Sequence, residues 1–248
     1  INKKNRLLFT KEKTKLMNGG IYYVNKKLLN LIPNKKISLE NEILPKLISD
    51  KKIDGFYFKN KFIDMGLKKN LDFLRKNPNI TKQKAFFLDR DGVINKLNPN
   101  GYITSIKDFK FLNDIPKAIK YLNKHNFLVI IITNQACVGK SIITEQKLNN
   151  IHRFMKKKIY EKTNGIINDI FFSPYYKFSK LKKYRLYHND RKPNSGMIKK
   201  AVIKWNIDLK KSFFIGDSLN DYIVAKKNHI KFYYKKEISL HKQIKSII

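Results

Sequence analysis

Apolar runs that end abruptly in polar residues organise the chain from about residue 84 onward. Residues 85–88, 128–132 and 212–215 are mainly apolar over the length of a strand. Such runs are typical of strands that are buried on both faces of a parallel sheet. A helix-like stretch at residues 195–205 precedes the last run. We therefore expect an α/β fold, a Rossmann-like doubly wound parallel sheet, with a small α/β fragment before it.

Polar side chains that can carry chemistry follow each of these predicted strands. Asp89 and Asp91 follow the first strand, Thr133 follows the second, and Asp217 follows the third. Ligands of open α/β sheets bind beyond the carboxyl ends of the strands. A carboxylate at such a position can attack a phosphoryl group, and a second can carry the proton. For the first segment taken alone, an Asp-rich turn is the alternative.

The order of these residues resembles the haloacid dehalogenase superfamily of phosphotransferases, and most closely its histidinol-phosphate and heptose-bisphosphate phosphatase branch. The resemblance covers roughly residues 84–235. The shared segments are FLDRDGVIN (87–95), GY (101–102), DFKF (108–111), TNQ (133–135), RKPNSGM (191–197) and GDSLND (216–221). Their common order makes the resemblance specific, and it implies a sheet of the haloacid dehalogenase type.

The resemblance implies a reaction through an aspartyl-phosphate. In this family pattern Asp89 is the nucleophile, while Asp91 protonates the leaving alkoxide and then activates water. Thr133 donates a hydrogen bond to the phosphoryl oxygens, and Lys192 neutralises their charge and restrains Asp89. Phosphate monoesters react so slowly in water that enhancements of ~10²¹-fold are possible, and the enzyme must supply positioning and charge.

The same resemblance implies a Mg²⁺ cofactor. The implied ligands are Asp89, the main-chain carbonyl of Asp91, and Asp217, and a hard cation suits such oxygen ligands. Asp221 is expected to orient Lys192 or the metal shell. The alternative for Asp221 is a helix N-terminal carboxylate that the helix dipole favours.

One departure from the family lies in a loop that binds zinc in many members. The usual Cys-Pro-His-His start reads SPYY at residues 173–176, and the usual Cys-x-Cys finish reads HND at residues 188–190. His188 and Asp190 alone cannot close a tetrahedral site. We predict that this loop is free of zinc and is held by other packing.

A second departure follows the TNQ segment, where the family tends to read SGIARG and this chain reads ACVGKS. Lys140 keeps the positive charge of the usual Arg but not its planar fork, and Cys137 replaces a glycine. We predict Asn134, Lys140 and Arg191 as substrate-binding residues. Lys140 and Arg191 are the cations best placed for a phosphate that is not cleaved, and a solvated Lys140 is the alternative.

Composition limits the class of protein. A chain of 248 residues with 42% hydrophobic content can form one or two domains with a buried core. A single cysteine excludes an internal disulfide and favours a reducing, cytoplasmic location. No apolar run approaches the ~18 residues of a membrane span, and no signal peptide is visible. Because the chain starts with Ile1, we expect a fragment or a processed product.

The charge balance is strongly basic. Lys and Arg number 54 against 19 Asp and Glu, a formal net charge of +35. Nucleic-acid binding would explain it, but the lysines are scattered and no nucleic-acid-binding signature is present. Abundant Lys, Asn and Ile also fit AT-rich codons. We expect no specific nucleic-acid partner, only weak attraction to polyanions, in a positive field that favours anionic sugar phosphates.

The division that we expect is a region at residues 1–78 and a phosphatase domain at residues 79–248. In the first region we predict strands at 20–24 and 53–58. We also predict helices at 26–31, at 67–76 and from Ser38 onward, the last of them with a side-chain cap. Residues 77–84, which are polar and contain Pro78, are the predicted linker.

The first region is similar to the C-terminal portion of sugar-phosphate nucleotidyltransferases. The match covers roughly residues 15–76 and rests on NGGIYYV (18–24), SLE (38–40) and FIDMG (62–66), in which Asp64 would bind Mg²⁺. The chain lacks the N-terminal half whose Gly-rich loop binds the nucleotide. We expect a remnant or truncated fusion, active only if it associates with a nucleotidyltransferase half from another chain.

This region helps to choose between substrates. A sugar-nucleotide partner suits heptose activation and not histidine synthesis. We therefore expect a Mg²⁺-dependent heptose bisphosphate phosphatase, by analogy in a route with an α-anomer and GDP-heptose. A histidinol phosphatase or another small sugar-phosphate phosphatase is one alternative. A non-catalytic decayed fusion or basic polyanion-binding protein is the other, although every expected phosphatase side chain is present.

Overall fold

The structure is a computed structural model that describes residues 7, 18–57, 62–99 and 101–248. The chain divides into two units, residues 1–76 and residues 77–248. Residues 15–17 and 58–61 of the nucleotidyltransferase-like match, with the end of the predicted strand at 53–58, lie outside the described residues.

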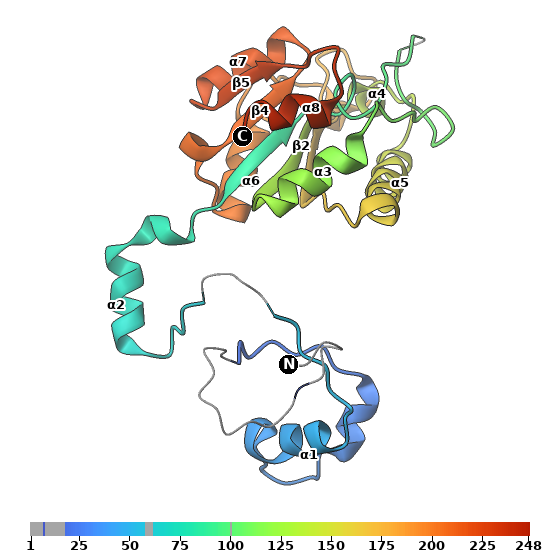
Figure 1. The fold of residues 1–248 in the computed structure, drawn as a ribbon. Coiled ribbons are helices and arrows are strands. Elements are labelled where there is room, and N and C mark those ends of the chain that lie inside the picture. Colours follow the sequence, from blue (N-terminus) through green and yellow to red (C-terminus); the bar gives the residue numbers. More distant parts are fainter. Residues whose placement is uncertain (1–6, 8–17, 58–61, 100) are drawn as a thin grey trace. The chain divides into compact units, whose positions relative to one another are not determined.

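A parallel five-stranded sheet forms the centre of the second unit (Figure 1). The strands are β1 (Lys84–Leu88), β2 (Phe127–Asn134), β3 (Asp169–Ser173), β4 (Phe213–Gly216) and β5 (Lys231–Tyr234), in the order β3-β2-β1-β4-β5. Phe87 of the central strand lies opposite Ile130 on one side and Phe214 on the other. The chain order reverses beside β1, so its carboxyl end lies at the switch point where such sheets bind ligands. The predicted doubly wound parallel sheet is confirmed.

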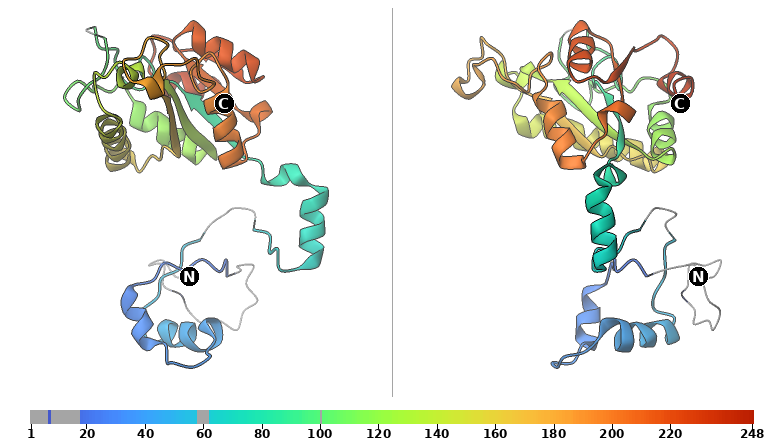
Figure 2. Two further views of the ribbon diagram at one scale, coloured as in Figure 1. Left: turned by 180° about the vertical axis from the view of Figure 1, so that it is seen from behind. Right: turned by 90° about the vertical axis from the view of Figure 1, so that its left-hand side faces the viewer.

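Helices cover both faces of this sheet (Figure 2). Strand residues alternate between the faces, so Phe86 enters one buried core and Phe87 enters the other. The first core packs against α3 (Ile115–Lys124), α5 (Glu145–Thr163) and α8 (Leu240–Lys245), and the second packs against α6 (Gly196–Trp205) and α7 (Leu219–Lys227). Short helices α4 (Ala136–Gly139), η4 (Lys182–Tyr184) and η5 (Leu209–Lys211) lie in the connections.

Polar side chains start several of these helices. Thr144 accepts a hydrogen bond from the Lys147 amide at the start of α5, and Ser239 accepts one from the Lys242 amide at the start of α8. Such caps satisfy backbone donors that have no partner within the helix. The helix predicted at 195–205 is confirmed as α6.

The first unit contains the predicted helices but not the predicted strands. Helices η1 (Lys26–Leu31), η2 (Leu39–Ile43), α1 (Leu44–Ser49) and α2 (Lys68–Lys76) are present. The Ser38 cap is confirmed, because its Oγ accepts from the Asn41 amide at 3.1 Å and its amide donates to Glu42 at 3.0 Å. The strands predicted at 20–24 and 53–58 are wrong for the described residues, where Asp54 forms only an isolated bridge. The β-branched and aromatic residues of these segments favour extended backbone, but a strand also needs a neighbour to complete its ladder.

The predicted linker needs one correction. Residues 78–81 form the short helix η3 (Pro78–Thr81), and Lys84 belongs to β1, where it pairs with Phe127. Pro78 suits a first helical turn because that position needs no amide donor.

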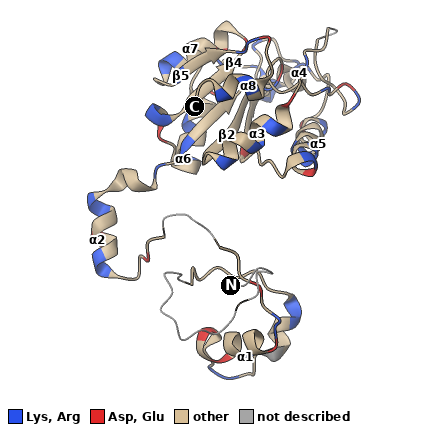
Figure 3. Ribbon diagram, in the orientation of Figure 1, with Lys and Arg blue, Asp and Glu red and all other residues tan. Residues whose placement is uncertain are grey.

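The basic side chains spread over elements of both units, as the blue segments of Figure 3 show on α2, α3, α5 and α6. Of the helices in the described ranges, none combines the length and the apolarity that a membrane crossing requires.

Candidate active site

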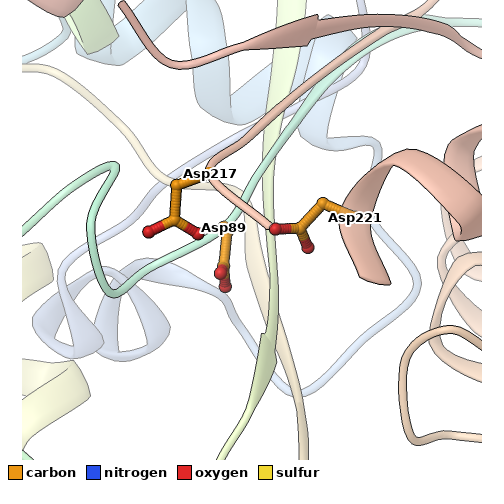
Figure 4. Close-up of side chains that lie close together, drawn as sticks. All are labelled: Asp89, Asp217 and Asp221. Atoms are coloured by element: carbon orange, nitrogen blue, oxygen red, sulfur yellow. The ribbon is translucent and has the colours of Figure 1, made fainter. Parts of the chain in front are cut away.

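The residues predicted to act on phosphate meet at the carboxyl edge of the sheet. Asp89 follows β1 directly and is 8% exposed, and Thr133 on the neighbouring strand is 1% exposed. The Nζ atom of Lys192, from the loop before α6, lies 2.9 Å from Oδ1 of Asp89. Asp217 follows β4, and its carboxylate lies beside that of Asp89 (Figure 4).

Lys192 is a buried cation held by three oxygen atoms. Its Nζ lies 2.6 Å from Oδ1 of Asp221 and 3.0 Å from the Ile132 carbonyl, in addition to Asp89. Burial by itself would lower the pKa of Lys192, but the charges of Asp89 and Asp221 outweigh it and raise the pKa above its usual value. The lysine therefore stays charged next to the predicted nucleophile.

Asp221 combines the two roles that the sequence left as alternatives. It is fully buried near the start of α7, and its Oδ2 accepts from the Ser218 hydroxyl at 2.6 Å and the Ser218 amide at 3.2 Å. This is a capping box, which satisfies free amide donors of the first turn. Its other oxygen holds Lys192.

Three carboxylates lie close enough to hold one cation. One oxygen each from Asp89, Asp217 and Asp221 lies within 4.8 Å of the other two. Burial and the charge of Asp221 raise the pKa of Asp217, and burial raises the pKa of Asp89 even though Lys192 opposes it. A cation among these oxygens would stabilise the ionised carboxylates, and a hard divalent ion fits the donor set.

The backbone turn after Asp91 brings Asp217 close to this chain segment. Gly92 has φ +81°, and a Cβ atom there would lie 1.8 Å from Oδ2 of Asp217. Only glycine fits both the dihedral angle and the close approach. The carboxylate of Asp217 therefore lies against the peptide unit that carries the predicted carbonyl ligand of Asp91.

The Asp91 side chain is held by several donors. Its carboxylate accepts from Arg90, from Asn95 Nδ2 at 2.9 Å and from Gln135 Nε2 at 2.7 Å. Burial would raise the pKa of Asp91, but the Arg90 charge and these hydrogen bonds outweigh it, so that the pKa lies below its usual value. In this arrangement Asp91 is a carboxylate, the form that can take a proton from water.

Asn134 contacts the loop that carries Lys192. Its Nδ2 donates to the Lys192 carbonyl at 3.1 Å, and its Oδ1 accepts from the Lys192 amide at 3.0 Å. These two hydrogen bonds fix the backbone of Lys192 relative to β2. A direct contact of Asn134 with substrate stays a prediction.

The two predicted cations for a second phosphate lie at the half-buried rim of the site. Nζ of Lys140 lies 4.7 Å from the ring centroid of Tyr176 and 5.3 Å from that of Tyr102. Arg191 donates to the Tyr175 carbonyl at 3.0 Å. The hydrogen bond to Tyr102 raises the pKa of Lys140, while the nearby charge of Arg191 acts in the opposite direction. Lys140 thus contacts aromatic rings rather than projecting freely into solvent.

The loop that carries zinc in many relatives is held here by other contacts. The rings of Tyr175 and His188 stack at 3.7 Å with an interplanar angle of 10°. Asp190 forms an ion pair with Lys200, and Tyr184 donates to Glu145. These contacts provide the packing that we expected in place of a metal, and the absence of zinc stays a prediction.

Sequence reasoning gave no role to Arg90, Gln135 and His152, which contact Asp91 directly or, for His152, through Arg90. Arg90 and Gln135 belong to the FLDRDGVIN and TNQ motifs, so the motifs could have pointed to a role for both residues. His152 had only a weak signal, its place on the buried face of α5 with Ile151 and Met155.

The parallel sheet and the carboxylate cluster at its switch point define an α/β phosphotransferase of the haloacid dehalogenase type. Residues 83–239, more than half of the chain, match the model of the family described as polynucleotide kinase 3 phosphatase. The chain therefore belongs to this family.

Curated relatives share more than two thirds of their length with the chain. It is 32% identical over 149 residues to D-glycero-beta-D-manno-heptose-1,7-bisphosphate 7-phosphatase of Haemophilus ducreyi, covering 60% of this chain and 80% of the relative. The enzyme of the same name from Rhodopseudomonas palustris is 36% identical over 146 residues, covering 58% and 79%. D-glycero-alpha-D-manno-heptose-1,7-bisphosphate 7-phosphatase of Burkholderia mallei is 33% identical over 140 residues, covering 56% of this chain and 72% of the relative.

A solved structure has the same fold. The D,D-heptose 1,7-bisphosphate phosphatase from B. bronchiseptica, complexed with magnesium and phosphate, aligns with a TM-score of 0.55 and 24% identity. The alignment covers 66% of this chain and 87% of that chain.

Proposed function

We propose that this chain is a Mg²⁺-dependent D-glycero-D-manno-heptose 1,7-bisphosphate 7-phosphatase. The observation that carries the proposal is the pairing of a buried aspartate, Asp89, with a buried lysine, Lys192, at the switch point of the sheet. The relatives named for this activity, at 32–36% identity, support the substrate class.

The reaction that these residues would perform has two steps. Asp89 attacks phosphorus, the bond to the carbon-7 oxygen breaks, and Asp91, which has to be protonated in the substrate complex, gives its proton to that oxygen. Water then attacks the aspartyl-phosphate, Asp91 takes the proton of the water, and phosphate leaves Asp89 free. Thr133 would donate to a phosphoryl oxygen, while Lys192 would balance the charge that develops.

Asp89, Asp217 and the carbonyl of Asp91 would hold Mg²⁺. Both oxygens of Asp221 already accept hydrogen bonds, from Lys192 and from Ser218, so we assign Asp221 to positioning rather than to the metal. When bound, the ion would supply positive charge against the transferred phosphoryl group.

Lys140 and Arg191 would bind the phosphate at carbon 1, which is not cleaved. Two cations at the rim, one of them against two tyrosine rings, suit a phosphorylated sugar. The α-anomer is our preference, by analogy with the resemblance of the first region to sugar-phosphate nucleotidyltransferases. We propose that this region is a remnant or truncated fusion, active only if a nucleotidyltransferase half from another chain associates with it.

Phosphate release from heptose bisphosphate and from histidinol phosphate, with and without Mg²⁺, tests the proposal. We expect Mg²⁺-dependent release that favours the heptose substrate. Asp89→Asn should abolish turnover with an unchanged fold, whereas Asp72→Asn, an exposed carboxylate on α2, should have wild-type activity. Substantial Mg²⁺-dependent hydrolysis by Asp89→Asn would refute the nucleophile, and a preference for histidinol phosphate would refute the substrate.

A further inference from the structure

A buried polar network lies behind Asp91. Arg90 is fully buried, and its Nη2 donates to both carboxylate oxygens of Asp91 at 2.9 Å and to Oε1 of Gln135 at 3.0 Å. Its Nη1 lies 3.1 Å from Nε2 of His152 on α5. A buried guanidinium without partners would be costly, and these contacts together offset that cost.

Gln135 connects two residues that would act in different parts of the reaction. It is 1% exposed, and its Nε2 donates to Oδ2 of Asp91 at 2.7 Å and to Oγ1 of Thr133 at 2.9 Å. The orientation of the amide is fixed, because a flipped amide would place its oxygen against the carboxylate and its nitrogen against the guanidinium of Arg90.

The bond from Gln135 also occupies one acceptor site of the Thr133 hydroxyl. A hydroxyl has one hydrogen to donate and two lone pairs to accept. Since Oγ1 of Thr133 accepts from Gln135, its own hydrogen is left to donate elsewhere. Binding a phosphoryl oxygen requires such a donor.

His152 is the last residue of the network and contacts Arg90, not Asp91. Arginine only donates, so Nε2 of His152 must be the acceptor, and the ring proton must be on Nδ1. Burial and the Arg90 charge lower the pKa of His152 to about 3, which agrees with a neutral ring. The ring therefore fixes one edge of the guanidinium whose other edge holds Asp91.

The carboxylate of Asp91 is close to saturated by these donors. Five contacts reach its two oxygens, three from Arg90, one from Asn95 and one from Gln135. A carboxylate has about four lone-pair sites. Its position is consequently set by the network, and not by solvent.

We propose that Gln135, Arg90 and His152 form a positioning network that fixes the carboxylate of Asp91 and the hydroxyl of Thr133 relative to each other. The network contributes to the rate by alignment, without touching substrate. The inference rests on the proposed function, in which Asp91 transfers the proton and Thr133 binds the phosphoryl group.

The first test replaces Gln135 by Met, which has a similar shape and no polar atom that could reproduce the bonds. Misplacement of a reacting group by about 1 Å can cost roughly 10²-fold. We expect kcat/KM to fall by about that factor for alkyl phosphates, whose leaving group needs a proton, and much less for aryl phosphates. The inhibition constant of inorganic phosphate should rise, because Thr133 loses its orientation. Gln146→Met, an exposed position on α5, is the matched control.

The second test uses two variants of His152. His152→Leu removes the acceptor of Arg90, whereas His152→Gln offers an amide oxygen in its place. We expect the leucine variant to lose alkyl phosphatase activity selectively at unchanged KM, and the glutamine variant to recover most of it. If both variants lose alkyl and aryl activity equally, or if the glutamine variant recovers nothing, the residue has only a packing role and the inference is wrong.

Asp91→Asn separates this inference from the proposed function. If Asp91→Asn lowers alkyl and aryl activities equally, then Asp91 is not the general acid and the proposed function fails in this part. If Asp91→Asn discriminates between the substrates while Gln135→Met and His152→Leu fold and do not discriminate, the network is refuted and the proposed function stands.

Discussion

Replacement of Asp221 should show how much the ion pair between Asp221 and Lys192 stabilises the fold. In Asp221→Ala a fully buried ammonium loses its 2.6 Å partner and keeps Asp89 and the Ile132 carbonyl. A hydrogen bond to a charged group contributes ~1.5–3 kcal/mol, and breaking a buried ion pair outright costs ~3–5 kcal/mol. Because two contacts of Lys192 remain, we expect the loss of this contact to lower the free energy of unfolding by about 2 kcal/mol, within the range for a single hydrogen bond to a charged group.

The same substitution removes the side-chain half of the capping box, in which Oδ2 of Asp221 accepts from the Ser218 amide and hydroxyl. Loss of such a cap costs ~1 kcal/mol, so the free energy of unfolding should fall by about 3 kcal/mol in total. Asp221→Asn keeps an oxygen acceptor in place, and about half of this loss is expected. The rate should also fall, because Lys192 would no longer be held against Asp89.

Urea denaturation followed by the fluorescence of Trp205 suits this measurement. Trp205 is the single tryptophan and lies in α6, so the signal reports the second unit. Ser239→Ala removes the cap of α8 and a hydrogen bond to the side chain of Asp114, and it should cost ~1 kcal/mol. If Asp221→Ala is no more destabilising than Ser239→Ala, then the contact with Lys192 contributes nothing measurable and the reasoning is refuted.

Further predictions concern acid stability, zinc and the second phosphate. The unfolded chain protonates His152 below pH 6.5 whereas the folded chain does so near pH 3, so stability should be lost as pH falls through this window, by roughly 2 kcal/mol at pH 5. In urea titrations at several pH values, His152→Gln should flatten the decline of the free energy of unfolding with falling pH, and His125→Gln should not. If both variants show the same decline, the titration of His152 is not its cause. Elemental analysis of protein purified without added metal should find no stoichiometric zinc, and its presence would contradict the metal-free packing of residues 173–190. Lys140→Ala and Arg191→Ala should raise KM for the bisphosphate far more than for a monophosphate, with the 1-phosphate as product, and loss of the anomeric signal in phosphorus NMR would overturn this regiochemistry.

The sheet could be predicted where its strands are buried on both faces. The runs at 85–88, 128–132 and 212–215 are nearly uninterrupted because central strands have no solvent-facing positions. The edge strands β3 and β5 gave no such signal. Most of their residues are half-buried or exposed, and β3 begins with a charged residue, Asp169. An edge strand contacts solvent along one side, so its sequence is mixed.

The position of the site followed from motif order, but its internal contacts did not. Strand ends of a parallel sheet meet at one edge, so Asp89 and Thr133 had to lie near each other. The burial of Arg90 could not be read from the sequence, because charged residues are almost never fully buried unless they are paired. The link from Asn134 to the Lys192 backbone also depends on how a loop 58 positions further on folds back.

The contacts divide the site into a fixed part and a variable part. Asp89 and Lys192, the predicted nucleophile and its cation, are buried and have several protein partners each, so we expect their geometry to change little with the rest of the substrate. Lys140 and Arg191 are half-buried and come from loops, and departures from the family pattern lie directly beside them in the sequence, at residues 136–141 and 188–190. A rigid core with adaptable loops is how one scaffold keeps its chemistry while its substrate changes. Substitutions near Lys140 should therefore alter which sugar phosphate is accepted, and substitutions around Lys192 should alter the rate for all of them.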